Sequence, residues 1–224
     1  MSIMDYFRGY RKTNYEAGGC VIEDIPLSAV RSISPSQFIA PKKIDFRDMC
    51  LESSNQGQSP HCTGYGTAGF IEVQNWRKRH YPEQVDGDAI YTETKRIDGH
   101  PNVQGSWVNF AVQAAINLKL VEGRGEAIEP NMQDFKFAIH EFGVCISCFM
   151  ITDDWNKVDS RGRIFNSGDK AKQLGGHCVL GVGYDEEGVY IQNSWSTSWG
   201  LYGFALLGWE QFNKQFMNGM VIRS

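Results

Sequence analysis

Two stretches near the end of the 224-residue chain decide its fold: residues 175–184, which read GGHCVLGVGY, and residues 191–200, which read IQNSWSTSWG. The first is apolar after its histidine and predicts a strand, and a second strand is expected over residues 189–192. The acidic segment 185–188, DEEG, supplies the turn of a hairpin between them. His177 therefore lies at the rim of the expected sheet, where a loop enters a strand.

Upstream of this hairpin the sequence has the periodicity of helices. Ser59 suits an N-cap and Pro60 a first helical position, and the basic run 77–79 fits the last turn of the same helix. Further helices are expected over residues 106–118 and 131–142, and further strands over residues 144–152 and 204–207. Helices first and strands afterwards predict an α+β fold in two lobes with a cleft between them.

The chain is expected to form one compact unit, residues 44–224, behind an N-terminal extension. The extension, residues 1–43, is too short to fold as a domain, and a short amphipathic turn is expected around residues 3–10. We expect the helical lobe over residues 44–130 and an antiparallel, β-rich lobe over residues 131–224.

Composition excludes several classes of protein. Thirteen Phe, nine Tyr and six Trp are incompatible with a disordered chain. The 22 basic and 26 acidic residues are spread along the chain, which argues against a nucleic-acid partner or an anionic membrane surface. No apolar stretch approaches the roughly 20 residues of a membrane helix. The start of the sequence is not typical of a signal peptide, so a cytoplasmic location with reduced cysteines is expected.

Cys62 is the candidate nucleophile. It falls in the first turn of the helix expected from Ser59, where unpaired N–H groups and the helix dipole stabilise a thiolate. From position alone, a buried cysteine that acts as a small hydrophobe is an equal alternative. His177 stands apart from the other four histidines by its place at the sheet rim, although a structural role is open to it as well.

The motifs resemble those of the papain family of cysteine peptidases. Residues 193–200, NSWSTSWG, are similar to the family motif Asn-Ser-Trp-Gly-Thr-x-Trp-Gly, and residues 175–184 are similar to its histidine strand. The six-residue step from Gln56 to Cys62 matches as well, and residues 44–47, IDFR, look like the start of a mature enzyme. The resemblance covers about residues 44–210, with its segments in the family's order.

The resemblance implies a catalytic triad. Cys62 is then the nucleophile, and His177 is its base and later the acid that protonates the leaving amine. Asn193 orients the imidazole through its side-chain oxygen. The resemblance implies no metal and no organic cofactor.

It also implies supporting residues. The Gln56 amide and the Cys62 backbone N–H form the oxyanion hole, and Trp195 shields the hydrogen bond between the histidine and the asparagine. A weaker match assigns Gly105 to the position whose backbone pairs with an extended substrate.

The sequence departs from the family pattern around the nucleophile. Residues 59–63, SPHCT, replace the usual Cys-Gly-Ser-Cys-Trp, so the neighbouring disulfide cysteine and the following aromatic are absent. The step of 115 residues from Cys62 to His177 is shorter than the roughly 130–150 of the family, which predicts trimmed loops. Cys178 is expected in the core, because the family usually has a small apolar residue at that position. Cys145 and Cys148 are also expected in the core, because no second cysteine pair completes a zinc site.

The expected function is a cysteine-type peptidase that hydrolyses peptide bonds of a polypeptide substrate through a thioester acyl-enzyme. Two alternatives stay open: a related Cys-His acyl-transfer enzyme, transglutaminase-like or a cell-wall amidase, and a catalytically silent binding module on the same fold. The extension is expected to cross the site and to autoinhibit it in part, as a short zymogen segment would.

Overall fold

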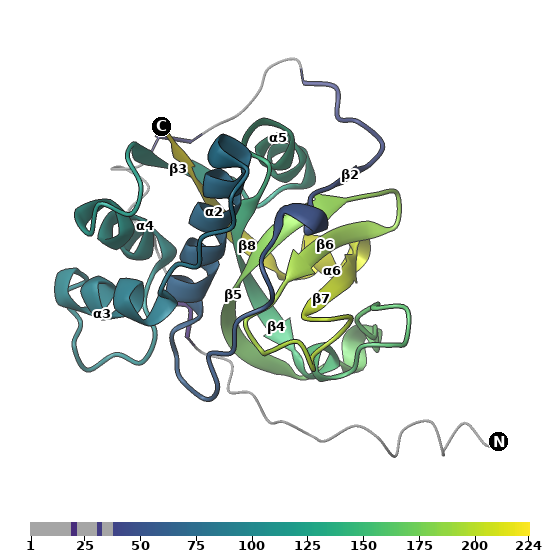
Figure 1. Ribbon diagram of the computed structural model, residues 1–224. Helices are drawn as coiled ribbons and strands as arrows, with labels where there is room; N and C mark the ends of the chain where they lie inside the picture. The colour runs from purple at the N-terminus through teal and green to yellow at the C-terminus, as the bar shows by residue number, and fades with distance from the viewer. Residues whose placement is uncertain (1–18, 22–30, 33–37) are drawn as a thin grey trace.

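The computed structural model describes residues 19–21, 31–32 and 38–224 (Figure 1). The turn expected around residues 3–10 lies outside these residues. Within the described part, one eight-stranded sheet runs in the order β1-β3-β8-β4-β5-β6-β7, and β2 pairs with β5 off this path. The strands are β1 (Arg31–Ser32), β2 (Ile44–Asp45), β3 (Arg124–Ile128), β4 (Cys145–Thr152), β5 (Gln173–Tyr184), β6 (Gly188–Gln192), β7 (Phe204–Gly208) and β8 (Phe216–Arg223).

All strand pairs are antiparallel except β1 and β3, which are parallel. The helices are α2 (Cys62–Arg79), α3 (Gly87–Ile97), α4 (Val108–Asn117), α5 (Met132–Phe142) and α6 (Trp209–Gln215). In Figure 1, α2 runs between the sheet and the pair α3 and α4. No helix of the described residues is long and apolar enough to cross a bilayer.

The α+β fold predicted from the sequence is confirmed. The strands expected over 144–152, 189–192 and 204–207 and the helix expected over 131–142 form within a residue or two of their predicted bounds. The division into a helical lobe, residues 44–130, and a β-rich lobe, residues 131–224, remains a prediction. Strand β3 falls within the first of these ranges but belongs to the sheet, where it pairs with β8. Helices α3 and α6 and strands β1, β2, β3 and β8 were not predicted from the sequence.

Helix α2 begins later than the sequence suggested. Ser59 does not cap it, because the Ser59 hydroxyl donates back to the Gln56 carbonyl at 2.7 Å, and His61 takes the N-cap position. Cys62 is therefore the first residue of the helix. The helix ends at Arg79 as expected, where His80 adopts the left-handed region with φ 52°.

Two glycines let α2 approach its neighbours closely on two sides. A Cβ at Gly64 would lie 2.2 Å from the carbonyl oxygen of Gly87 in α3, and a Cβ at Gly66 would lie 2.8 Å from Cys178 Sγ in β5. Glycine weakens an isolated helix, so tertiary packing stabilises this one. This packing fixes Cys62, one turn before Gly66, against strand β5.

Candidate active site

Cys62 occupies the N-terminus of α2 with its side chain fully buried. The first N–H groups of a helix lack partners inside the helix, so this position favours an anion. Helix α2 packs against β5, and Cys178, the residue after His177, lies beside the thiol. The nucleophile predicted from the sequence therefore lies against the strand that carries the predicted base.

His177 lies inside β5, four residues after the strand begins, rather than at its start. Asn193 directly follows β6, the strand next to β5, and its Oδ1 lies 2.8 Å from His177 Nε2. The same oxygen accepts from the Ser194 backbone N–H at 2.8 Å. Because this atom is an acceptor, His177 Nε2 is the donor, and the neutral ring keeps its lone pair on Nδ1.

The other ring nitrogen of His177, Nδ1, is not used by the hydrogen bond to Asn193. It is buried and has no hydrogen-bond partner among the described residues. A lone pair held in this way can take a proton from a thiol. The arrangement leaves the histidine oriented by Asn193 on one side and available for acid–base chemistry on the other.

Two tryptophans contact the imidazole of His177, and a third packs against both of them. Trp195 stacks on it with ring centroids 4.7 Å apart, and Trp155 meets it edge-on at 6.2 Å. Trp199 packs edge-on against Trp195 and donates its indole N–H to the Trp155 carbonyl at 2.9 Å. Trp195 was predicted from the sequence, but Trp155 was not, because it lies in an unrelated short helix after β4 and no local pattern marks it.

Burial controls the protonation of both partners in this structure. Burial lowers the pKa of His177 to about 4, although its hydrogen bond to Asn193 acts in the opposite direction. Burial, aided by the nearby Cys20 and Cys178 thiols, raises the pKa of Cys62 well above its ordinary value. The thiol and the imidazole are therefore both neutral here, although the helix N-terminus by itself would favour a thiolate at Cys62.

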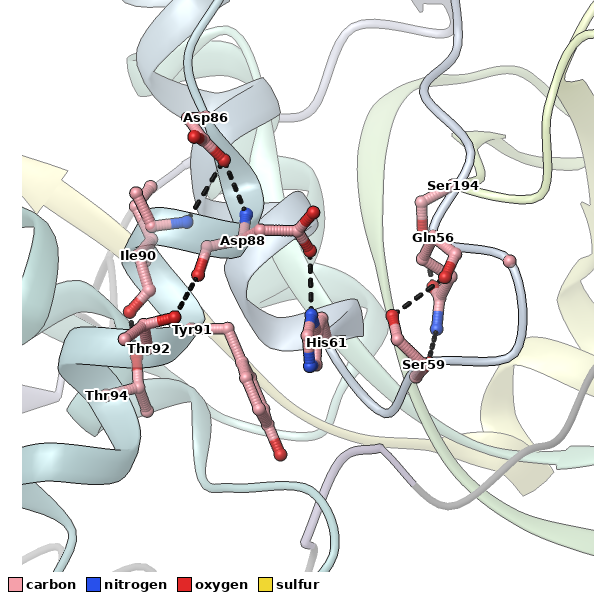
Figure 2. Close-up of polar contacts among 12 residues, drawn as sticks. Gln56, Ser59, His61, Asp86, Asp88, Ile90, Tyr91, Thr92, Thr94 and Ser194 are labelled. Atoms are coloured by element: carbon pink, nitrogen blue, oxygen red, sulfur yellow. Dashed lines mark hydrogen bonds and ion pairs between the residues drawn. The ribbon is translucent and has the colours of Figure 1, made fainter.

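The loop before α2 carries the predicted oxyanion-hole residue, Gln56. Its Nε2 donates to the Ser59 carbonyl at 2.7 Å, and its Oε1 accepts from the Ser194 hydroxyl at 2.6 Å (Figure 2). These two bonds fix the plane of the amide. The Gln56 backbone N–H also donates to the Ser194 carbonyl at 2.9 Å, and Asn55 forms a β-bridge with Trp195. The glutamine loop and the asparagine loop are thus joined as one unit.

Residues 19–21, which we call the cleft segment, cross the site. The Ser106 N–H donates to the Gly19 carbonyl at 3.1 Å, and the Val21 N–H donates to the Ser106 carbonyl at 3.0 Å. On the other side, the Cys20 N–H donates to the Gly176 carbonyl at 3.3 Å, next to His177. A Cβ at Gly19 would lie 2.7 Å from Cys62 Sγ. The chain's own N-terminal segment therefore covers the candidate nucleophile.

The residue that pairs with this segment is Ser106, one position after Gly105. The Gly105 N–H donates to the Tyr91 hydroxyl at 3.1 Å, and its carbonyl accepts from Lys95 Nζ at 3.1 Å. Both backbone groups of Gly105 are therefore engaged within the protein. The assignment of Gly105 to substrate remains a prediction, and Ser106 was not found from the sequence.

Asp98 holds the loop that presents Ser106. Its carboxylate accepts from Lys95 Nζ at 2.6 Å and from the Ser106 hydroxyl at 2.8 Å. Burial by itself raises the pKa of the Asp98 carboxyl, but these hydrogen bonds and one from the His100 backbone outweigh it, and the pKa is lowered. The loop is therefore fixed by a buried charged group.

His61, the neighbour of the nucleophile, is directed toward α3. Its Nδ1 lies 2.7 Å from Asp88 Oδ1, and its ring stacks on Tyr91 with centroids 4.0 Å apart (Figure 2). This side-chain contact joins the start of α2 to α3. Within the described residues, no group of three or more His, Cys, Asp or Glu side chains is arranged to hold a metal ion.

Known proteins resemble this chain in sequence and in fold. No model of a known protein family matches the chain. The chain is 24% identical over 199 residues to cysteine proteinase 3 of Entamoeba histolytica, an alignment that spans 78% of this chain and 65% of that protein, slightly less than two thirds of its length.

Solved structures resemble the fold over nearly the whole chain. The crystal structure of xylellain, a cysteine protease from Xylella fastidiosa, superposes with a TM-score of 0.80 at 18% identity and covers 96% of this chain and 98% of that one. Procathepsin B S9 from Trypanosoma congolense superposes with a TM-score of 0.71 at 15% identity and covers 92% of this chain and 86% of that one. The resemblance inferred from the motifs is confirmed, and the chain has the fold of the papain-like cysteine proteases.

Proposed function

We propose that this protein hydrolyses peptide bonds with Cys62 as nucleophile and His177 as base. The observation that supports it most directly is the orientation of His177: Asn193 holds Nε2 at 2.8 Å, and Nδ1 is left without a partner among the described residues. A cysteine at a helix N-terminus, beside a histidine oriented by a third group, is the arrangement that activates a thiol.

The proposed reaction has two stages. In the first, the Cys62 proton passes to His177 Nδ1, the sulfur attacks the peptide carbonyl carbon, and the C–N bond breaks as the imidazolium returns its proton to the leaving amine. In the second, water attacks the resulting thioester, gives a proton to His177, and releases the acid product while the thiol is restored. The Gln56 amide nitrogen carries two hydrogens, and one of them is used by Ser59. We assign the other, with the Cys62 N–H, to the oxyanion.

The cleft segment is the proposed inhibitor of this reaction. It runs in extended form over Cys62 and pairs with Ser106 on one side and Gly176 on the other, as a bound peptide would. With the segment in place the thiol is fully buried and no substrate can reach it. We propose that catalysis requires residues 19–21 to leave the cleft, and that the ion pair of Cys62 and His177 forms only then.

A peptide-substrate library tests the proposal, with the full chain, a Cys62→Ala variant and a truncation that starts at Ala40. Cleavage by the full chain, its absence in Cys62→Ala and an increase in the truncated chain are expected. Cys50→Ala is the matched control, because Cys50 is half-buried outside the site and its loss leaves cleavage intact. Cleavage retained by Cys62→Ala contradicts the mechanism, and an unchanged rate in the truncated chain contradicts the autoinhibition.

The alternatives named from the sequence are separated in the same experiment. Added amines reveal acyl transfer, and peptidoglycan fragments reveal a cell-wall amidase. A binding module would cleave none of these substrates, and the thiol of Cys62 would have the reactivity of an ordinary cysteine.

A further inference from the structure

Four cysteine thiols gather where the cleft segment crosses the sheet. Cys148 and Cys178 are directly opposite each other on β4 and β5, so their side chains share one face. Cys148 contacts the thiols of both Cys178 and Cys20, and Cys178 lies beside Cys62. All four side chains are buried, and all are reduced in this structure.

Two of these thiols, Cys20 and Cys148, are in direct contact although they are 128 positions apart in the sequence. Their sulfur atoms lie 3.0 Å apart. A disulfide bond is about 2.05 Å long, so the two sulfurs need to approach by only about 1 Å. One of them is on the cleft segment and the other is on the central sheet, which makes their bond a link between the inhibitor and the enzyme.

We propose that Cys20 and Cys148 form a reversible disulfide that locks the cleft segment over the active site. The backbone of Cys20 already pairs with Ser106 through its two neighbours and with Gly176 directly. A covalent bond at its side chain therefore holds the segment in the position seen here, with Gly19 against the Cys62 sulfur. This inference rests on the proposed function for its consequence, but the disulfide itself forms without catalysis.

The oxidant that the step requires is a low-molecular-weight disulfide, such as oxidised glutathione. With the segment open, the Cys20 thiolate attacks one sulfur of this disulfide, and the other sulfur leaves as a thiolate. When the segment returns to the sheet, the sulfur of Cys148 attacks the Cys20 sulfur and expels the second small thiolate, and the two protons lost by the cysteines end on the two small thiols. The protein dithiol is oxidised and one small disulfide is reduced to two thiols.

The open segment is the reactive state because it exposes Cys20. In the closed state both thiols are buried: Cys20 is 4% exposed and Cys148 is 0% exposed. Contact with the other thiols and burial raise the pKa of Cys148 well above its ordinary value, so it is a poor nucleophile while covered. Oxidation therefore traps molecules that open, and a reductant releases them.

The disulfide is tested first in the full chain with Cys62→Ser, where neither activity nor the nucleophile can interfere. After incubation with oxidised glutathione, non-reducing peptide mapping is expected to show the peptide of Cys20 linked to that of Cys148. Cys148→Ser in the same background abolishes this link, and Cys50→Ser leaves it intact. A map without the link, or with Cys148 joined to Cys178 instead, overturns the inference whether or not the protein proves to be a peptidase.

The lock is then tested in the chain with Cys62 present. Oxidation is expected to lower peptide cleavage by about tenfold or more, since a covalent tether greatly raises the effective concentration of the segment. The intact mass should fall by two hydrogen atoms, and dithiothreitol should restore both mass and rate. A loss of cleavage that coincides with a glutathione adduct on Cys62, or with a bond between Cys20 and Cys62, contradicts the lock.

Discussion

The two halves of the candidate site are stabilised in different ways. On the sheet side, His177 is held by a 2.8 Å hydrogen bond to Asn193 and by stacking on Trp195, contacts that leave its reactive nitrogen ready. On the helix side, Cys62 is surrounded by Gly19 and by the thiols of Cys20 and Cys178, contacts that keep it neutral and covered. For the proposed reaction, the histidine half is therefore positioned in advance, whereas access to the cysteine half depends on the position of the cleft segment.

The largest expected effect comes from removing either reacting group. Cys62→Ala and His177→Ala should each lower kcat by about five to six orders of magnitude, and the double variant should be no worse, because the two groups act as a unit. Steady-state peptide hydrolysis measures this, with His140→Ala on the exposed face of α5 as the matched histidine control. An additive loss in the double variant would mean that the two halves act independently.

A smaller decrease in kcat is expected from substitution of Gln56, which lies in the loop that joins the two halves of the site. Gln56→Ala should lower kcat by about 10²–10³-fold with little change in KM, since an oxyanion donor acts mainly on the transition state. Gln56→Glu keeps the size of the side chain and removes the donor, so it should lose a similar factor. A change confined to KM would show that Gln56 binds substrate instead.

Substitution in the cleft segment is expected to increase the rate of peptide cleavage rather than to lower it. In Gly19→Val the new Cβ would lie 2.6 Å from the Pro60 carbonyl oxygen and 2.7 Å from Cys62 Sγ, so the segment must shift. Overpacking of this kind costs about 1–3 kcal/mol, which should raise cleavage by about tenfold. Gly208→Ala is the control, because its Cβ would meet nothing nearer than 3.8 Å. Cleavage unchanged by Gly19→Val would show that the segment does not limit access to Cys62.

The smallest expected effect is on the pH dependence of stability. The pKa of His177 is lowered to about 4 in the folded protein, below the unfolded value of about 6.5, so between these values the unfolded chain binds the extra proton. Stability from this residue is therefore greatest above pH 6.5, falls as the pH drops toward 4, and levels off below. Urea unfolding of Cys62→Ala should lose about 1 kcal/mol from this source between pH 7 and pH 5.5.

Substitution of His177 itself isolates its contribution to the pH dependence of the free energy of unfolding. Cys62→Ala with His177→Gln should lack this part of the pH dependence, whereas Cys62→Ala with His80→Gln, on the surface, should retain it. The same slope in all three proteins would mean that His177 is not buried in its neutral form.

The sequence predicted the histidine half better than the cysteine half, for a physical reason. His177 lies on β5, and Asn193 and Trp195 lie in the loop that follows the neighbouring strand β6, so one short stretch of sequence contains all three. Cys20, Ser106 and Cys148 come from distant parts of the chain, and only the folded sheet and the loop before α4 bring them together. No spacing rule predicts such a meeting.

The helices also show how far local sequence patterns can predict structure. The end of α2 was predicted from its basic last turn, but its start was displaced because Ser59 bonds to Gln56 instead of capping the helix. Helix α3 was missed even though Asp86 is a typical N-cap that accepts from Asp88 and Ala89. A local signal can therefore be overridden by a competing loop, as at Ser59, or be too weak to identify a helix by itself, as at Asp86.

The extension is anchored beyond the cleft as well as within it. Arg31 and Ser32 pair with β3, and Ile44 and Asp45 pair with β5, so the chain that follows the cleft segment is attached to the sheet at two further places. A released segment therefore stays tethered close to the active site. Its return is a first-order process, so dilution does not slow it. Blockade of this kind is the same in a dilute assay and in a crowded cell, and a competing peptide must exceed a fixed local concentration in order to displace it.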